Sequence, residues 1–96
     1  MTLPPWRVEY LEAVVEDDIP ALPKPVRNTV ERAIMNRLAV DPVGFGRPLR
    51  HSLAGHRRLR VGDYRIVYRI DAGKRAVVIS VIKHRKDVYE TKRQAD

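Results

Sequence analysis

The chain has 96 residues, 44% of them hydrophobic, and a formal net charge of +7, which predicts a single domain over residues 1–96 with a packed core and argues against a fully disordered chain. It has no cysteine, which excludes disulfides, cysteine nucleophiles and zinc-thiolate or iron–sulfur sites. No apolar run approaches the roughly 18 residues of a membrane span, and the first residues lack the pattern of a signal peptide, so we expect a cytoplasmic protein without membrane contact.

The first half of the chain reads as a strand followed by two helices. Residues 6–10 alternate apolar and charged side chains, which predicts a strand. Apolar residues at helical spacing over residues 11–22 predict a helix that Pro20 shortens or ends irregularly. A second helix is expected over residues 25–38, because Pro25 suits a first helical turn and the break at Asp41-Pro42 follows its apolar stripe. Residues 43–48 are expected to form a loop.

The second half changes to the period of two that is typical of strands. Gly62-Asp63 lies between two alternating runs, residues 56–61 and 64–70, which predicts a hairpin with a type II′ turn. Residues 76–82 are apolar on both faces and should form a buried central strand. The tail from Lys83 is polar and basic, with a short helical turn expected around residues 87–92. These elements predict an α+β fold: an N-terminal strand and a two-helix hairpin packed on a twisted antiparallel sheet.

The positive charge is concentrated in the second half. Residues 1–48 have 6 basic and 7 acidic side chains, whereas residues 49–96 have 13 basic and 5 acidic ones. This asymmetry favours a polyanionic partner, with nucleic acid first and an anionic membrane surface second; solubilising surface charge is the alternative. The hairpin register gathers the basic side chains on one sheet face, which indicates a bound anion or acidic partner unless it is simply a solvated outer face: His56, Arg58, Arg60, Arg65 and Arg69.

The run of residues 83–89 offers the side chains best suited to proton transfer. His84 has a reference pKa near 6.5 and Tyr89 one near 10, although an ordinary surface histidine is the alternative for His84. Lys83, Arg85 and Lys86 add positive charge beside them. Three scattered histidines without a carboxylate motif, and the absence of a glycine-rich phosphate loop, predict neither a metal site nor a cofactor.

Four short motifs occur together in this chain: Pro-Leu-Arg at 48–50, Leu-Ala-Gly at 53–55, Gly-Asp-Tyr-Arg at 62–65 and His-Arg-Lys-Asp-Val-Tyr at 84–89. Over about residues 7–89 the chain resembles the RelE/ParE toxin superfamily. The resemblance implies the RelE-like fold and a toxin of a bacterial type II toxin–antitoxin pair. It also implies a cognate acidic, RelB-like antitoxin that forms a hetero-oligomer with the toxin. RelE-like members cleave mRNA in the ribosomal A site, whereas ParE-like members poison DNA gyrase.

The resemblance also implies roles for individual residues. Arg58 matches a family lysine, and Arg65 matches the family arginine that follows Gly-x-Tyr. Near the C-terminus, Tyr89 matches a RelE tyrosine, Arg85 approximates a family arginine, and His84 resembles the general acid of YoeB-like members. Two departures leave the general base open: His56 stands where RelE has a lysine, and Arg47 stands where YoeB-like members have a glutamate.

The mechanism that these matches imply is metal-free cleavage of mRNA by its own 2′-OH. Arg65, Arg58 and Arg60 would hold the scissile phosphate, and Tyr89 or His56 would accept the 2′-OH proton. His84 or Arg85 would assist the 5′-oxygen leaving group, with His84 favoured because arginine is a weak acid. Further RNA and phosphate contacts are expected from His56, Arg60, Arg69, Lys83 and Lys86. The alternatives are a gyrase inhibitor without RNA cleavage, and a toxin fold that only binds.

Overall fold

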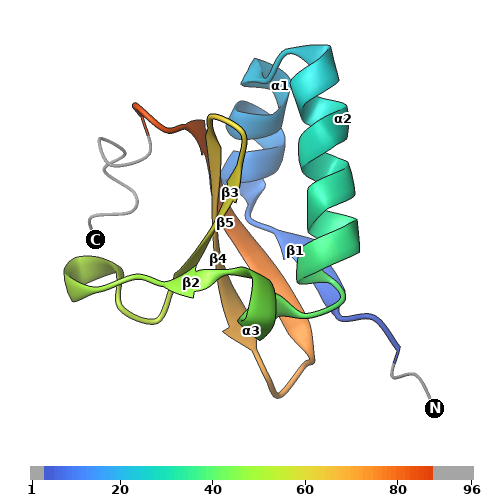
Figure 1. The fold of residues 1–96 in the computed structure, drawn as a ribbon, viewed down its shortest axis with the longest axis vertical. Coiled ribbons are helices and arrows are strands. Elements are labelled where there is room, and N and C mark those ends of the chain that lie inside the picture. Colours follow the sequence, from blue (N-terminus) through green and yellow to red (C-terminus); the bar gives the residue numbers. More distant parts are fainter. Residues whose placement is uncertain (1–3, 88–96) are drawn as a thin grey trace.

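A five-stranded sheet with helices on one face forms the structure, a computed structural model that describes residues 4–87 (Figure 1). The strands lie in the order β1-β5-β4-β3-β2, so that β1 and β2 are the edges. This arrangement confirms the predicted α+β class. The strand bounds are β1 (Arg7–Tyr10), β2 (Arg47–Pro48), β3 (Arg57–Val61), β4 (Tyr64–Asp71) and β5 (Ala76–His84).

The two predicted helices are present, and each contains a wide π-helical turn. The first runs through η1 (Val14–Asp18) into α1 (Ile19–Ala21), and the second runs through α2 (Lys24–Ala33) into η2 (Ile34–Leu38). The wide turn in η1 comes just before Pro20, whose ring would clash with the preceding turn of a regular α-helix. Among the described residues, no helix has the length and apolar character needed to cross a bilayer.

The hairpin of β3 and β4 has the predicted register. Val61 pairs with Tyr64 and Arg60 pairs with Arg65, as a two-residue turn at Gly62-Asp63 requires. Gly62 has a φ of +58°, the left-handed value that the first central position of a type II′ turn needs. Because successive side chains alternate between faces, this register separates an apolar face from a basic one.

The main core lies between the helices and the apolar face of the sheet. Ile34 and Leu38 from the second helix pack in one cluster with Ile66, Tyr68 and Ile79 from the sheet. A second, smaller cluster on the opposite face joins Val67 and Val81, with the half-buried Leu49 against them. The sheet therefore buries apolar side chains on both faces of β5, which explains the continuous apolar run in that strand.

Several details differ from the predicted elements. β1 pairs parallel to β5, which is possible because the helices provide the long crossover that a parallel pair needs. The predicted loop at residues 43–48 instead contains α3 (Pro42–Phe45) and β2, and a short 3₁₀ turn, η3 (His51–Leu53), follows. Asp41 starts α3 by accepting a 3.0 Å hydrogen bond from the Gly44 N–H.

The C-terminal boundary also differs. β5 continues through Lys83 and His84, which the sequence placed in the tail, because Arg65 and Tyr64 of β4 pair with them. Apart from Asp87, the helical turn predicted around residues 87–92 lies outside the described residues, as does Tyr89.

Candidate functional site

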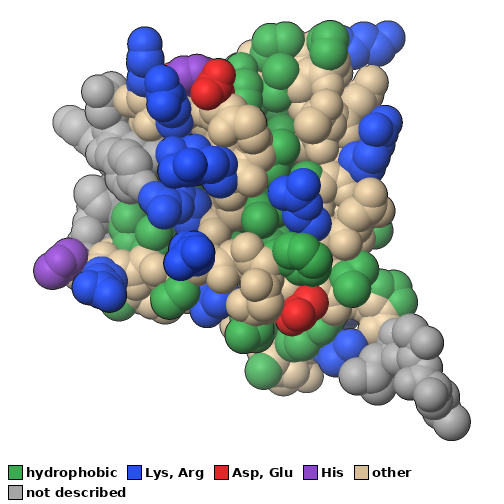
Figure 2. Space-filling view, viewed as in Figure 1, with side chains coloured by type: hydrophobic (Ala, Val, Ile, Leu, Met, Phe, Trp, Pro, Cys, Tyr) green, Lys and Arg blue, Asp and Glu red, His purple; other side chains and the backbone are tan. Residues whose placement is uncertain are grey.

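The basic face predicted from the hairpin register is formed by β3 and β4 on the side of the sheet opposite α2. Figure 2 shows Lys and Arg side chains gathered over the half of the molecule that holds β2 and the β3–β4 hairpin. The five residues of the basic face differ in exposure. Arg60 and Arg69 are exposed, His56 and Arg58 are half-buried, and Arg65 is buried. We use the term basic face for these five residues.

Arg65 is the unusual member of the basic face. Its side chain is only 8% exposed, and within residues 4–87 neither its Nε nor its Nη1 has a hydrogen-bond partner. Its neighbours across the two ladders are Arg60 on β3 and Lys83 on β5, both of them cations. Burying a guanidinium with unpaired donors is costly, and like charges on neighbouring strands repel. The site is therefore suited to an anion that accepts from Arg65.

Arg58 and His56 lie on β3 and just before it, on the same side of the sheet as Arg65. Arg58 pairs with Val67, two residues from Arg65, so the two arginines are diagonal neighbours across the ladder. The Nδ1 atom of His56 is buried and lacks a hydrogen-bond partner among the described residues. The structure thus brings together two predicted phosphate ligands and one of the two candidate bases.

Lys83 has a partner that the sequence did not predict. Its Nζ lies 3.1 Å from Oδ1 of Asp18, a residue of η1 that is 1% exposed. The other carboxylate oxygen, Oδ2, accepts a 2.9 Å hydrogen bond from the Ile82 N–H. β1 pairs with β5 only as far as Ile79, so Asp18 serves this part of the strand edge in place of a neighbouring strand. The ammonium group of Lys83 is thereby held toward the helical side.

His84 lies on the opposite side of the sheet from Arg65. It pairs with Tyr64, and the two rings meet edge to face with centroids 5.3 Å apart. Its Nδ1 accepts a 3.3 Å hydrogen bond from the Lys86 N–H. Arg85 and Lys86 are exposed in the turn after β5, where the Arg85 N–H donates to the Asp63 carbonyl. The described residues therefore do not bring His84 together with the basic face.

β2 pairs only with Arg57 and Arg58, so the rest of β3 has an open edge on that side in the described structure. A groove at this open edge of β3 contains residues that the sequence did not single out as a group. It has a volume of about 380 Å³ and is lined by Arg37, Phe45, Arg47, Arg58, Leu59 and Arg60. Arg37 follows Val30 and Ala33 at helical spacing, a signal that could have placed it on the side of the helix facing the sheet. Phe45 could not have been placed, because α3 was expected to be loop.

The wall of this groove is fastened to the sheet by two polar side chains. Arg57 Nη2 donates to the carbonyls of Val43 and Gly46, at 2.8 and 2.9 Å. The Tyr68 hydroxyl donates to the Pro42 carbonyl at 2.6 Å. Burial raises the pKa of Tyr68, and the nearby Arg57 partly opposes that rise. Together these bonds fix α3 and the start of β2 against the sheet.

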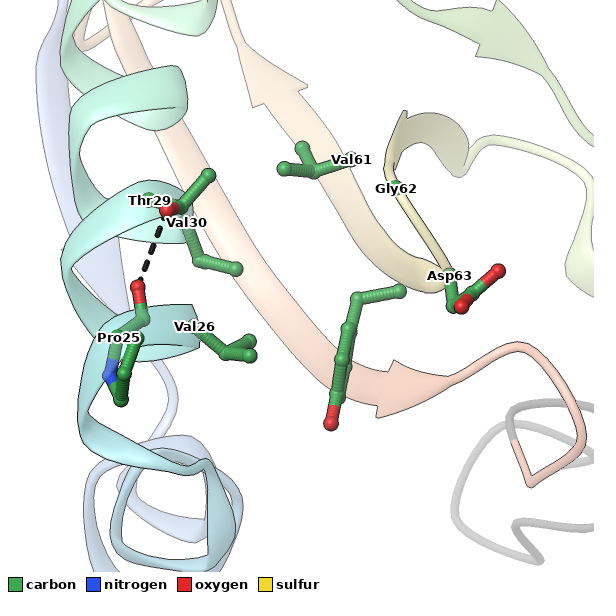
Figure 3. A pocket seen from close by; sticks show the side chains of 8 residues that line it. Pro25, Val26, Thr29, Val30, Val61, Gly62 and Asp63 are labelled. Carbon is green, nitrogen blue, oxygen red and sulfur yellow. Dashed lines mark hydrogen bonds between the residues drawn. The ribbon is translucent and has the colours of Figure 1, made fainter.

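A second hollow lies on the helical side, between α2 and the hairpin turn (Figure 3). Its volume is about 290 Å³, and its lining is mostly apolar, with Val26, Val30, Val61 and Tyr64 among the residues. Thr29, also at this hollow, bonds back to the Pro25 carbonyl within its own helix. With no cation among the described residues of its lining, this hollow is a poorer phosphate site than the groove at β3.

Comparisons with known proteins agree with the resemblance seen in the sequence. Residues 8–89 match the family model described as ParE toxin of type II toxin-antitoxin system, parDE. Toxin RelG of Mycobacterium tuberculosis is 39% identical over 85 residues, which cover 88% of this chain and 97% of that protein. Toxin RelE of the same organism is 34% identical over 79 residues, covering 82% and 81%.

A solved structure gives the same result in three dimensions. The toxin–antitoxin complex RelBE2 of Mycobacterium tuberculosis contains a chain that superposes with a TM-score of 0.80 and 34% identity. The match covers 90% of this chain and 98% of that one. The family match and the relatives each span most of the chain, and the fold agrees over the same length. The chain belongs to the RelE/ParE superfamily of toxins of type II toxin–antitoxin systems.

Proposed function

We propose that this toxin is a ribosome-dependent endoribonuclease that cleaves mRNA in the A site by attack of the 2′-OH on the adjacent phosphate, without a metal or other cofactor. The observation that carries the proposal is Arg65, a buried guanidinium with two donor atoms unpartnered among the described residues. Toxins named RelG and RelE among its relatives support a RelE-like rather than only a ParE-like activity.

Arg65 and Arg58 would hold the scissile phosphate from neighbouring strands. Guanidinium groups bind phosphate oxygens through paired N–H donors, and these bonds strengthen as negative charge develops in the transition state. Arg60 and Arg69, both exposed on the same face, would contact phosphates on either side. Lys86 would add charge from the turn after β5, whereas Lys83 contributes less directly because Asp18 holds its ammonium group.

Proton transfer is assigned to the groups around this face. His56 or Tyr89 accepts the 2′-OH proton, and His84 or Arg85 protonates the 5′-oxygen as it leaves. The geometry supports His56 more directly than His84, because His56 lies on the side of Arg65 while His84 contacts Tyr64 on the helical side. The products would be a 2′,3′-cyclic or 3′-phosphate end and a 5′-OH end.

The proposed partner is an acidic, RelB-like antitoxin in a hetero-oligomer with this chain, and the proposed location is the cytoplasm, where ribosomes and mRNA are found. One relative of known structure was solved as the toxin–antitoxin complex RelBE2 of Mycobacterium tuberculosis. A strongly basic half of the chain gives an acidic antitoxin a surface to neutralise.

A second candidate function is inhibition of DNA gyrase without RNA cleavage. The family model that matches residues 8–89 is described by its ParE toxins, which favours this alternative. The burial of Arg65 weighs against the gyrase alternative, because buried cations are more typical of catalytic sites than of surfaces that only bind a partner.

The decisive experiment compares the wild type with Arg65→Ala in a reconstituted translation system, with toeprinting to locate cuts and a gyrase supercoiling assay in parallel. We expect A-site cuts from the wild type, a loss of at least about 100-fold in Arg65→Ala, and normal supercoiling with both. Cutting that survives the substitution unchanged would refute the assigned site. Inhibited supercoiling without mRNA cuts would establish the gyrase alternative.

A further inference from the structure

The groove at the open edge of β3 has the chemistry of a nucleotide site. Four arginines line it, Arg37, Arg47, Arg58 and Arg60, with Phe45 as the aromatic member and no carboxylate among the lining residues that the structure describes. The guanidinium groups of Arg37, Arg47 and Arg60, gathered around about 380 Å³, favour an anion between them, because like charges at short range repel. Phe45 is 49% exposed, so its ring is available to a planar group.

We propose that this groove is a subsite for single-stranded RNA, which stacks a base of the nucleotide next to the scissile one on Phe45 and holds its phosphate with Arg37, Arg47 and Arg60. This inference rests on the proposed function, because it extends the RNA path away from the cleavage site. Base stacking on an aromatic ring combined with cations along the backbone is the general mode of single-strand binding.

The groove is continuous with the basic face. Arg58 lines the groove and is also the diagonal neighbour of Arg65 across the β3–β4 ladder. Arg47 pairs with Arg58 across β2 and β3, which brings a further guanidinium to this boundary. An RNA strand with its scissile phosphate at Arg65 therefore reaches the groove by passing Arg58.

RNA fits the groove better than an acidic protein segment. The open edge of β3 could pair with an added strand, but such a strand also needs pockets for alternate side chains. Among residues 4–87, the apolar lining residues here are Phe45 and Leu59 alone, whereas planar guanidinium forks match phosphate oxygens.

The stacking platform is held in place before RNA binds. Arg57 donates to the carbonyls of Val43 and Gly46, which lie on either side of Phe45 in sequence. Tyr68 donates to the carbonyl of Pro42 at the start of the same helix. A platform fastened at three carbonyls loses little conformational freedom on binding, which favours affinity.

The test is a titration of the full-length toxin into a short single-stranded RNA that contains one 2-aminopurine. Every ribose of this RNA carries a 2′-O-methyl group, so the RNA cannot be cleaved. Anisotropy of an end label reports affinity, and quenching of 2-aminopurine reports stacking. Phe45→Leu should weaken binding about tenfold and reduce quenching, and Phe45→Tyr should restore both. Arg37→Ala should weaken binding and reduce the slope of log K against log salt by about 0.7.

The matched control is Arg32→Ala, which removes an exposed arginine of α2 that does not line the groove and should change neither readout. Equal losses in Phe45→Leu and Phe45→Tyr, or an unchanged salt slope in Arg37→Ala, would overturn the inference. Variants that bind RNA normally but lose affinity for the antitoxin would also overturn it and assign the groove to an acidic protein segment.

The two proposals fail separately in this design. Because the methylated RNA cannot be cut, its binding does not depend on the cleavage chemistry. A wild type that stacks the probe on Phe45 but leaves mRNA uncut on the ribosome would refute the proposed function and support the groove. A wild type that cuts mRNA, with groove variants that all bind the probe normally, would support the proposed function and refute the groove as an RNA subsite.

Discussion

Replacing Arg65 with methionine should stabilise the free toxin while it removes activity. Arg65 is 8% exposed and lies between Arg60 and Lys83 in the sheet, with two of its nitrogens unpartnered among the described residues. Methionine follows the aliphatic part of the arginine side chain and brings no charge, so it keeps the apolar packing without the desolvation cost. The expected result is a higher free energy of unfolding together with the loss of cleavage.

The magnitude follows from two contributions. Each like-charged pair directly across a ladder costs about 0.2–1 kcal/mol, and Arg65 has one with Arg60. Replacing buried ionic groups with apolar ones of similar volume often stabilises by about 1–4 kcal/mol. Since Asp18 partly neutralises Lys83, we expect a net gain of about 1–2 kcal/mol in the free energy of unfolding. Each kcal/mol corresponds to a rise of roughly 4–8 °C in Tm for a domain of this size.

Urea denaturation of the purified toxin, followed by circular dichroism, measures this gain. The matched control is Arg69→Met, an exposed residue of β4 on the same face, whose unfolding free energy should change by no more than about 0.5 kcal/mol. Inorganic phosphate should raise the stability of the wild type more than that of Arg65→Met, because the variant lacks the anion site at Arg65 and only a folded state with that site gains from its occupancy.

A loss of stability in Arg65→Met would refute the reasoning, because it would mean that the guanidinium makes favourable bonds in the folded state. Equal stabilisation of both proteins by phosphate would show that the anion binds elsewhere. Cleavage retained within about threefold would show that Arg65 does not contact the scissile phosphate.

Three further predictions concern the framework of the site. Gly46→Ala places a Cβ against the Tyr68 hydroxyl and should cost about 2–3 kcal/mol in urea denaturation. Tyr68→Phe should cost about 1–3 kcal/mol near pH 8. Because burial raises the pKa of Tyr68, the stability that its hydroxyl gives the wild type is complete below about pH 10 and is lost as pH rises through the folded pKa. Denaturation from pH 8 to 11 should therefore show a smaller loss of stability in the variant than in the wild type. Asp18→Ala removes the acceptor of the Ile82 N–H and the partner of the Lys83 ammonium, and it should lower the unfolding free energy by about 3 kcal/mol. Asp18→Asn should lower it by less, because the amide oxygen still accepts a hydrogen bond.

The hairpin shows what local sequence determines. Gly62 and Asp63 specify a two-residue turn, the turn specifies the register, and the register assigns every side chain of β3 and β4 to a face. The basic face was therefore predictable residue by residue. The burial of Arg65 was not, because burial depends on contacts between distant parts of the chain, such as the packing of Leu49 against Val67 and Val81.

Long-range pairing explains most of what the sequence did not predict. The partner of β1 is the last strand, far away in sequence, and no local pattern specifies a parallel pair with it. The C-terminal end of β5 was not predicted either, because it depends on the pairing of Lys83 and His84 with β4. A strand that continues through these two residues places their side chains on opposite faces. The sequence placed both in one basic run, where the structure separates them.

Asp41-Pro42 shows that one local signal can carry two meanings. Proline disfavours helix in the residue before it, which ended the second predicted helix correctly. An Asp followed by Pro is also a good start for a helix, with the carboxylate as cap and proline in the first turn. Reading only the first meaning left α3, and with it Phe45, in a loop.

The basic face connects stability, activity and control through one electrostatic feature. Arg60, Arg65 and Lys83 lie side by side on three neighbouring strands, and of these three only Lys83 forms an ion pair with a carboxylate of the described residues. Any anion that accepts from Arg65 relieves this repulsion, whether it belongs to RNA or to an acidic partner. Two such ligands must compete for the same donors, so a partner that covers Arg65 both stabilises the toxin and excludes its substrate. On this argument, Arg65→Met should weaken the binding of RNA and antitoxin together, although it folds more stably than the wild type.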